Sequence, residues 1–253
     1  MPTGICHICG TEGPLSFEHI PPRSAFNDHR VTRFRDTDTL LGPDAVATGP
    51  IQQRGMGGYT LCPRCNNNTG SWYGKDFVEW CYQGMEILER MGGNPRFMYL
   101  HRLYPLRVLK QIVTMFFSVN GDGFRQQHQE LVRFVLNREH KFLPPTYRFF
   151  LYYNTSSKSR AIGGVAMLRL KSHQMILPSE INYPPFGYVM TINSDPPDDR
   201  LAEISHFATY RYDEQVEVEV RMNVLPVETQ FPGDYRTKDE IYRDAGIKPT
   251  EKE

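Results

Sequence analysis

Four of the five cysteines in this chain of 253 residues fall in two Cys-x-x-Cys pairs, Cys6 with Cys9 and Cys62 with Cys65. Two residues between paired thiols let both sulfurs point at one ion, and two such pairs complete the four-thiolate site typical of structural zinc. The 52 residues that separate the pairs exceed the spacing of a simple zinc finger. A redox dithiol is the alternative for such pairs, and a reducing compartment favours zinc.

The region around these cysteines has the composition of a small, loop-rich module. Residues 1 to about 70 are rich in Gly, Pro, Cys and polar residues and show little helical periodicity. Such a module has too little apolar core to stand alone, and a structural metal usually supplies the missing stability. The fifth cysteine, Cys81, lies on the apolar face of a predicted helix and is interpreted as a core thiol, whereas His7 is expected to be exposed.

Composition excludes several classes of protein. Hydrophobic residues make up 40% of the chain and charged residues 23%, which is typical of globular proteins and not of disordered or fibrous ones. No run approaches the ~18 apolar residues of a membrane span, and the N-terminus lacks a signal peptide's layout. We therefore expect a cytoplasmic location and no membrane partner.

The formal net charge is zero, but the charges are unevenly distributed. Residues 66–194 carry 15 Lys and Arg against 8 Asp and Glu, and residues 195–253 carry 8 against 15. The basic middle is either a surface for a polyanion or a partner for the acidic end of the same chain.

Hydrophobic periodicity divides the rest of the chain into a helical part followed by strands. A helix is predicted to begin at Pro63, although Gly70 and Gly74 argue against an unbroken run to Gly92. The other predicted helices are Leu106–Val119 and Arg125–Glu139. The predicted strands are Thr146–Asn154, Ala161–Lys171, Gly187–Asn193, Glu203–Tyr212 and Gln215–Leu225. We expect an α+β protein, with a zinc module at 1–74 and a second domain at 75–253 made of helices (75–140), a mostly antiparallel sheet (146–225) and a charged tail.

Two motifs accompany the cysteine pairs. Leu15-Ser-Phe-Glu18-His19-Ile-Pro-Pro-Arg-Ser lies between them, and Asn66-Asn67-Asn68-Thr-Gly follows the second pair. Here the chain resembles the HNH endonuclease family, in the variant where one CxxC precedes an acidic-His-Ile/Val-x-Pro strand and the second opens the last motif's helix. The resemblance covers roughly residues 4–74. It implies a ββα-metal fold, in which a β-hairpin and a helix grip one divalent cation.

The resemblance also implies roles for individual residues. His19 matches the general base, Glu18 the acidic metal ligand and Asn66 the final metal-binding position, with Mg²⁺ or Mn²⁺ as the catalytic cation. Three consecutive amides leave open whether Asn66, Asn67 or Asn68 is the ligand. An imidazole with a pKa near 6.5 can accept a proton from water, and hard oxygen ligands suit Mg²⁺.

The sequence departs from the family pattern in three places. The final position is usually His; Asn also occurs there in the nuclease domain of RNA-guided enzymes, where it still binds the metal. The middle Asn, expected near Gly57, is absent, and the excursion between Asn27 and Gly58 is long. In addition, neighbouring residues of a strand point to opposite faces, so Glu18 and His19 share a site only if the strand breaks, for which Ile20-Pro21-Pro22 is a candidate.

Arginines flank the motifs. Arg23 and Arg64 are candidate substrate-binding residues because a guanidinium forms paired hydrogen bonds with a phosphate. Arg30, Arg33 and Arg35 could follow a nucleic-acid backbone or be solvated loop charges.

By resemblance, the chain is expected to cleave DNA rather than RNA, leaving a 5′-phosphate and a 3′-hydroxyl. A homodimer is an assembly that such nucleases adopt, and by analogy they serve as effectors in antiviral defence or restriction systems. Residues 75–253 are expected to bind a partner protein, a small-molecule activator or the nucleic acid. The alternative from another class is a non-catalytic zinc module that binds nucleic acid or protein, and a third interpretation makes the C-terminal sheet the active part.

Overall fold

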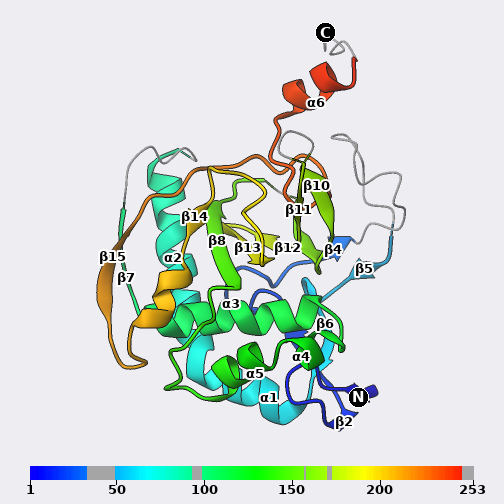
Figure 1. Cartoon of the computed structure of the whole chain (residues 1–253), viewed down its shortest axis with the longest axis vertical. Coiled ribbons are helices and arrows are strands. Elements are labelled where there is room, and N and C mark those ends of the chain that lie inside the picture. The colour runs from blue at the N-terminus through cyan, green and yellow to red at the C-terminus, as the bar shows by residue number, and fades with distance from the viewer. Residues whose placement is uncertain (33–48, 93–98, 157, 170–172, 247–253) are drawn as a thin grey trace.

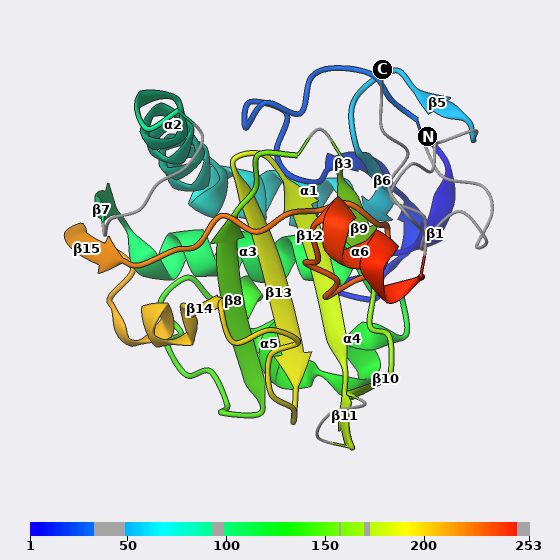
Figure 2. The same ribbon diagram turned by 90° about the horizontal axis from the view of Figure 1, so that it is seen from above.

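The computed structural model describes residues 1–32, 49–92, 99–156, 158–169 and 173–246. Helices cover one face of an antiparallel sheet, and the chain near the C-terminus crosses the other face (Figures 1 and 2). The predicted α+β class is therefore confirmed. Within the described ranges, no helix has the length and apolar character needed to cross a membrane.

The central sheet has five antiparallel strands built from aromatic and branched residues. Its order is β14 (Ala202–Glu203), β8 (Tyr147–Tyr153), β13 (Phe186–Ile192), β12 (Pro178–Tyr183) and β9 (Arg160–Ile162). Phe149 and Leu151 of β8 join the core on the helical face, whereas Phe150 and Tyr152 join Leu225, Val227 and Tyr235 on the other. Because both faces of β8 are buried, the strand has few polar positions.

Helix α3 (Pro105–Val119) lies across the helical face of the sheet and is buried along almost its whole length (Figure 2). It begins with proline at its first position, where the missing N–H is not needed. α3 contacts β12 on one side and the N-terminal part of the chain on the other. It therefore supports that part from the sheet, together with Tyr183 of β12, whose hydroxyl donates to the Phe26 carbonyl at 3.1 Å.

The N-terminal part consists of short strands followed by a helix. β3 (Ser16–His19) pairs antiparallel with β6 (Gly57–Leu61), and α1 (Pro63–Thr69) follows β6 almost at once. The remaining short strands form two antiparallel ribbons, β1 (Thr3–Ile5) with β2 (Glu12–Pro14) and β4 (Val31–Thr32) with β5 (Ile51–Gln52).

One helical run extends from Pro63 to Arg90, so the expectation that Gly70 and Gly74 interrupt it is wrong. α1 continues through a single π-helical turn, η2 (Gly70–Gly74), into α2 (Lys75–Arg90). Both glycines keep right-handed helical dihedral angles. The glycines thus mark a widened turn rather than an end, and the helical run continues across the predicted boundary after residue 74.

Two other predicted elements differ from the structure. The strand predicted over Glu203–Tyr212 is wrong: only β14 is extended, and a 3₁₀ helix, η3 (Ser205–Thr209), follows it. Ile204 and Phe207 are both buried, and a spacing of three suits a helix rather than a strand. The single helix predicted from Arg125 is two helices, α4 (Phe124–Gln127) and α5 (Gln129–Leu136), separated at His128.

The remaining strands form two ribbons outside the main sheet. β10 (Met167–Arg169) pairs with β11 (Gln174–Ile176), so the strand predicted over Ala161–Lys171 is interrupted after β9. β7 (Tyr99–Leu103), which was not predicted, pairs with β15 (Val216–Val220). In β15, Val218 and Val220 are buried and alternate with exposed glutamates, as predicted for a sheet with one wet face. Near the C-terminus, α6 (Lys238–Asp244) begins with a capping box.

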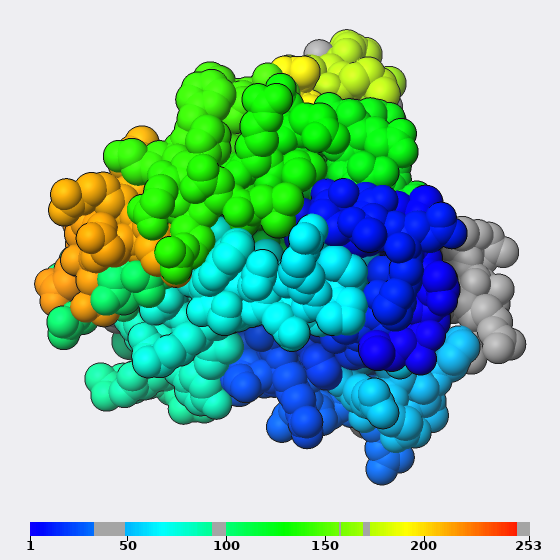
Figure 3. Space-filling view, turned by 90° about the horizontal axis from the view of Figure 1, so that it is seen from below, coloured from blue at the N-terminus to red at the C-terminus, as the bar shows by residue number. Residues whose placement is uncertain are grey.

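The N-terminal residues pack directly against the segment that contains α3 to α5 (Figure 3). Nδ1 of His7 lies 3.0 Å from the Phe117 carbonyl oxygen, and the Thr60 hydroxyl donates to Ser118 Oγ at 2.9 Å. His7, expected to be exposed, is therefore partly buried. Apolar residues from both sides of residue 74 belong to one core cluster.

Candidate functional site

The four paired cysteines come together at the junction of the N-terminal hairpin and α1. Cys6 and Cys9 lie in the turn between β1 and β2, while Cys62 caps α1 and Cys65 lies in its first turn. Their sulfur atoms all lie within 4.8 Å of one another, and the Cys9 and Cys62 sulfurs are 3.7 Å apart. A tetrahedral zinc site with bonds of about 2.3 Å has sulfurs about 3.8 Å apart. The geometry and the donor type fit a zinc ion held by these four residues.

The turn that carries the first pair depends on one glycine. Gly10 has a φ of 73°, in the left-handed region, and its N–H donates to the Cys6 carbonyl at 2.9 Å. A Cβ at this position would lie 2.2 Å from the Arg125 guanidinium. Cys81 is buried in the core and lies outside the group of four thiols.

Glu18 is a buried carboxylate on β3. Glu18 is 4% exposed, and its Oε2 has no hydrogen-bond partner among the described residues. Burial raises the pKa of Glu18 to about 8, and the nearby Cys6 sulfur adds to the effect. An unpartnered carboxylate in such a place is costly unless a cation neutralises it.

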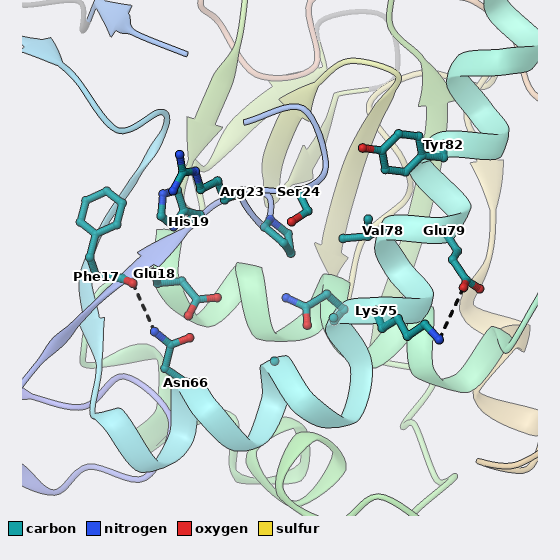
Figure 4. Close-up of a pocket in the computed structure, with 14 residues that line it drawn as sticks. Phe17, Glu18, His19, Arg23, Ser24, Asn66, Lys75, Val78, Glu79 and Tyr82 are labelled. Carbon is teal, nitrogen blue, oxygen red and sulfur yellow. Dashed lines mark hydrogen bonds and ion pairs between the residues drawn. The ribbon is translucent and has the colours of Figure 1, made fainter. Parts of the chain in front are cut away.

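Asn66 presents its amide oxygen on the same side as Glu18. Its Nδ2 donates to Ser16 Oγ at 3.0 Å and to the Phe17 carbonyl at 3.2 Å. These two acceptors fix the amide so that Oδ1 faces away from β3's backbone, and Figure 4 shows the Glu18 carboxylate and the Asn66 amide beside each other. Ser16 sits where the pairing of β3 with β6 shifts register, a bulge that re-aims the neighbouring side chains.

The other two asparagines occupy different positions. Asn66 lines the cavity next to Glu18, whereas neither Asn67 nor Asn68 is among the described residues that line it. Asn67 is exposed on the outer side of α1.

His19 ends β3 and lies at the edge of the same cavity. Its ring packs edge-to-face on Phe17, with centroids 4.9 Å apart, so His19 leaves the face of β3 opposite to Glu18. Both residues nevertheless line the cavity, because the strand stops at His19 and does not extend past it. The end of β3 at His19 thus lets Glu18 and His19 line one cavity although they leave opposite faces of the strand.

Burial lowers the pKa of His19 below its usual value. A hydrogen bond with the Arg54 backbone opposes this effect, and the positive charges of Arg23 and Arg54 add to it. His19 is therefore a neutral imidazole at neutral pH. The ring nitrogen that faces away from the Arg54 carbonyl is then a free proton acceptor.

The predicted arginines do not all reach the site. Arg23 is exposed and lines the cavity, whereas Arg64 is exposed in the first turn of α1 and is not among its described lining residues. Arg30 is exposed, and Arg33 and Arg35 lie outside the described residues. Arg54, which the sequence did not single out, lies at the other end of the excursion. Its backbone hydrogen-bonds to His19, and its positive charge helps to lower the pKa of His19.

Asn27 holds the two ends of the excursion together and was not predicted. It is fully buried, and its Nδ2 donates to the Pro21 and Met56 carbonyls at 2.7 Å each, while its Oδ1 accepts from the Met56 N–H at 2.7 Å. These bonds fix the backbone that follows His19. Gly57, near which the middle Asn was expected, has no room for a side chain, because a Cβ there would lie 2.1 Å from the Glu18 carbonyl oxygen.

Glu18, His19 and Asn66 share a cavity of about 690 Å³ between β3 and the helical run (Figure 4). Its other lining residues come from the loop after β3, from η2, from α2 and from α3. They are Phe17, Pro22, Arg23, Ser24, Gly70, Gly74, Lys75, Val78, Glu79, Tyr82 and Gln111.

Comparisons with protein-family models, curated proteins and solved structures gave no match to this chain.

Zinc content tests the four-thiolate site. Wild-type protein is expected to hold about one zinc ion per chain, and Cys62→Ser is expected to hold close to none and to unfold at a lower temperature, because structural zinc supplies folding free energy. The control Cys81→Ala removes a thiol outside the cluster and should keep its zinc. Elemental analysis with thermal denaturation checks this. Equal zinc in Cys62→Ser and wild type would contradict the assignment.

Asn27→Asp tests the hydrogen bonds by which Asn27 joins Pro21 to Met56, at the two ends of the excursion. The change keeps the shape but turns two donated hydrogen bonds into contacts between a carboxylate and carbonyl oxygens. We expect the free energy of unfolding to fall by about 3 kcal/mol. Chemical denaturation measures it, with Asp28→Asn at the exposed neighbouring position as the control, for which the change should stay within about 0.5 kcal/mol. Equal stability of Asn27→Asp and wild type would show that these hydrogen bonds are unimportant.

Proposed function

We propose that this protein is a metal-dependent endonuclease that hydrolyses DNA phosphodiester bonds at the cavity formed by Glu18, His19 and Asn66. One observation carries the proposal. Two hard oxygen donors, the Glu18 carboxylate with its unpartnered Oε2 and the oriented Asn66 amide, lie side by side in a cavity whose edge carries the neutral imidazole of His19. A structural role alone gives no reason to bury that carboxylate without a partner.

The arrangement of the backbone supports the same proposal. Two antiparallel strands, β3 and β6, lead into α1, and this is the order that a ββα-metal module requires. The cysteine cluster lies at the start of α1, so that zinc there would hold the helix against the strands. Asn27 ties the intervening excursion at its base.

His19 is the residue suited to activate water. As a neutral imidazole at neutral pH, it accepts a proton from a water molecule as the water oxygen attacks phosphorus, a role that contributes on the order of 10²- to 10⁴-fold. The Arg54 carbonyl orients its ring. Attack forms the new phosphorus–oxygen bond and breaks the bond to the 3′-oxygen, which takes a proton from solvent water, so that the products carry a 5′-phosphate and a 3′-hydroxyl.

The cation would be held by Glu18 and Asn66. Mg²⁺ or Mn²⁺ bound there supplies charge neutralisation for the phosphate and for the leaving alkoxide. When the cation displaces the proton of Glu18, this residue would contribute a negative charge in a buried place, and the amide of Asn66 would add a neutral oxygen. Arg23 at the cavity rim is positioned to bind a phosphate oxygen of the same strand.

Nicking of supercoiled plasmid tests the activity. Wild-type protein is expected to cut in Mg²⁺ or Mn²⁺ but not in EDTA, and His19→Ala, at matched zinc content, is expected to cut at least about 100-fold more slowly because the water loses its base. Arg221→Ala, at an exposed position outside the described lining of the cavity, is the control and should cut within about threefold of wild type. If neither protein cuts or binds a divalent cation, a non-catalytic zinc module is the better description.

The pH dependence of cation binding tests Glu18. Its pKa in the metal-free protein is raised to about 8, so below that pH a proton occupies the carboxylate and competes with the cation. We expect Mn²⁺ affinity to rise about tenfold per pH unit between pH 6 and 7.5 and to level off above about 8. Glu18→Gln should bind more weakly and without this slope. Titration calorimetry at constant zinc content measures both, and a flat wild-type profile would contradict the assignment.

A further inference from the structure

The cavity is larger than a phosphate and its cation require. Its volume of about 690 Å³ lies within the range of pockets that enclose a small organic molecule. From Glu18 and His19 it continues to a wall formed by one face of α2, where Lys75, Val78 and Tyr82 lie opposite β3 (Figure 4). The space between these walls is available to a group that is attached to the phosphate.

Two glycines keep the floor of this space open. Gly70 and Gly74 stand at the two ends of η2, and both line the cavity. A Cβ at Gly70 would meet nothing within 4 Å, and a Cβ at Gly74 would meet only Gln111 Oε1, at 4.0 Å. Side chains would therefore fit at both positions, at the expense of cavity volume. Since alanine is the better helix former, glycine here favours an empty floor rather than helix stability.

Gln111, on α3, brings an unsatisfied polar group to this floor. The residue is 2% exposed, and its Oε1 has no hydrogen-bond partner in the described parts of the chain. A buried acceptor without a donor costs about 1–3 kcal/mol. A ligand that carries an N–H group would remove this cost. A glutamine amide offers one donor side and one acceptor side, which is the pattern by which glutamine recognises the edge of a nucleobase.

The walls and the mouth of the cavity carry side chains suited to bind a nucleobase and the phosphates beside it. Pro22 and Val78 contribute apolar surface, and Tyr82, which is 54% exposed, presents an aromatic ring. Phe26 supports this ring, with the two centroids 4.8 Å apart. Arg23 and Lys75 lie on opposite sides of the cavity (Figure 4). Arg23 carries a positive charge that attracts a flanking phosphate, whereas Lys75 pairs with Glu79, with its Nζ 3.9 Å from Glu79 Oε1.

We infer that the cavity takes the base of one unpaired nucleotide next to the scissile phosphate, so that the substrate class is DNA with an unpaired nucleotide. This inference rests on the proposed function. A base inside a duplex is stacked and paired, and taking it out costs a few kcal/mol. Single-stranded DNA and a base that stands outside a duplex both avoid that cost.

Cleavage of three DNA substrates tests the inference. They share one labelled sequence: a single strand, a fully paired duplex closed by hairpin loops at both ends, and the same closed duplex with one bulged nucleotide. For the single strand or the bulged duplex, kcat/KM is expected to exceed the value for the paired duplex at least about tenfold, in line with the unstacking cost. The two favoured substrates distinguish a requirement for a single strand from a requirement for one extrahelical base.

Substitutions at two positions, Gly74 and Gln111, test the subsite without touching Glu18, His19 or Asn66. Gly74→Leu fills the floor and is expected to reduce the preference for unpaired DNA to less than about threefold, and Gly74→Ala should give an intermediate value. Ser71→Leu adds the same side chain on the exposed side of η2 and should keep the preference. Gln111→Met keeps the volume but removes the amide, and it should equalise cleavage next to the four bases. Zinc content and circular dichroism confirm that each variant is folded.

The outcomes separate the inference from the proposed function. If the paired duplex is cut as fast as the single strand, and His19→Ala abolishes both activities, the nuclease stands and the inference is wrong. The inference is also wrong if Gly74→Leu keeps the wild-type preference for unpaired DNA and Gln111→Met keeps the wild-type preference among the four bases. If wild type cuts none of the three substrates in Mg²⁺ or Mn²⁺, the proposed function fails and the inference fails with it.

Discussion

The site depends on the contact between the first cysteine pair and the start of α1. Cys6 and Cys9 sit in a turn between two strands of three residues each, and Cys62 and Cys65 lie 53 and 59 positions later than Cys9 and Cys6. Strands this short have few backbone bonds of their own, so a zinc ion held by the four sulfurs would join the β1–β2 hairpin to α1. The pairing of β3 with β6 and the hydrogen bonds from Asn66 to Ser16 and Phe17 place Glu18 near Asn66. Packing on α3 then supports the whole arrangement from the sheet.

The polar groups of the cavity are oriented but incompletely satisfied. Ser16 and Phe17 take the donors of Asn66, and Asn27 satisfies the backbone at the base of the excursion. By contrast, Glu18 Oε2 and Gln111 Oε1 lack partners among the described residues. These two open acceptors line one cavity, where a cation or an N–H group could satisfy them. The π turn contributes by widening the helix at the cavity floor.

Local sequence patterns predicted many elements of the fold and of the site, and the features that they missed depend on long-range contacts. The cysteine cluster and the start of α1 at Pro63 follow from short-range spacing, as does the alternation in β15. Asn27 was not predicted because its partners at Met56 lie 29 residues away, and no local pattern identifies such a bond. The strand expected over Glu203–Tyr212 failed because tertiary packing of Ile204 and Phe207 selected a 3₁₀ turn. Which of the three asparagines faces Glu18 depends on the rotation of α1 relative to β3. The sequence could not give this, because the three residues are identical.

Anomalous scattering of Mn²⁺ in crystals of the zinc-loaded protein would show directly whether Glu18 and Asn66 bind the cation. We expect one strong peak bound by a carboxylate oxygen of Glu18 and by Oδ1 of Asn66, at about 2.1–2.2 Å, with His19 facing a water or phosphate oxygen on the same ion. A Mn²⁺ ion bound elsewhere, or an Asn66 amide that turns its Nδ2 toward Glu18 at saturating Mn²⁺, would contradict this assignment.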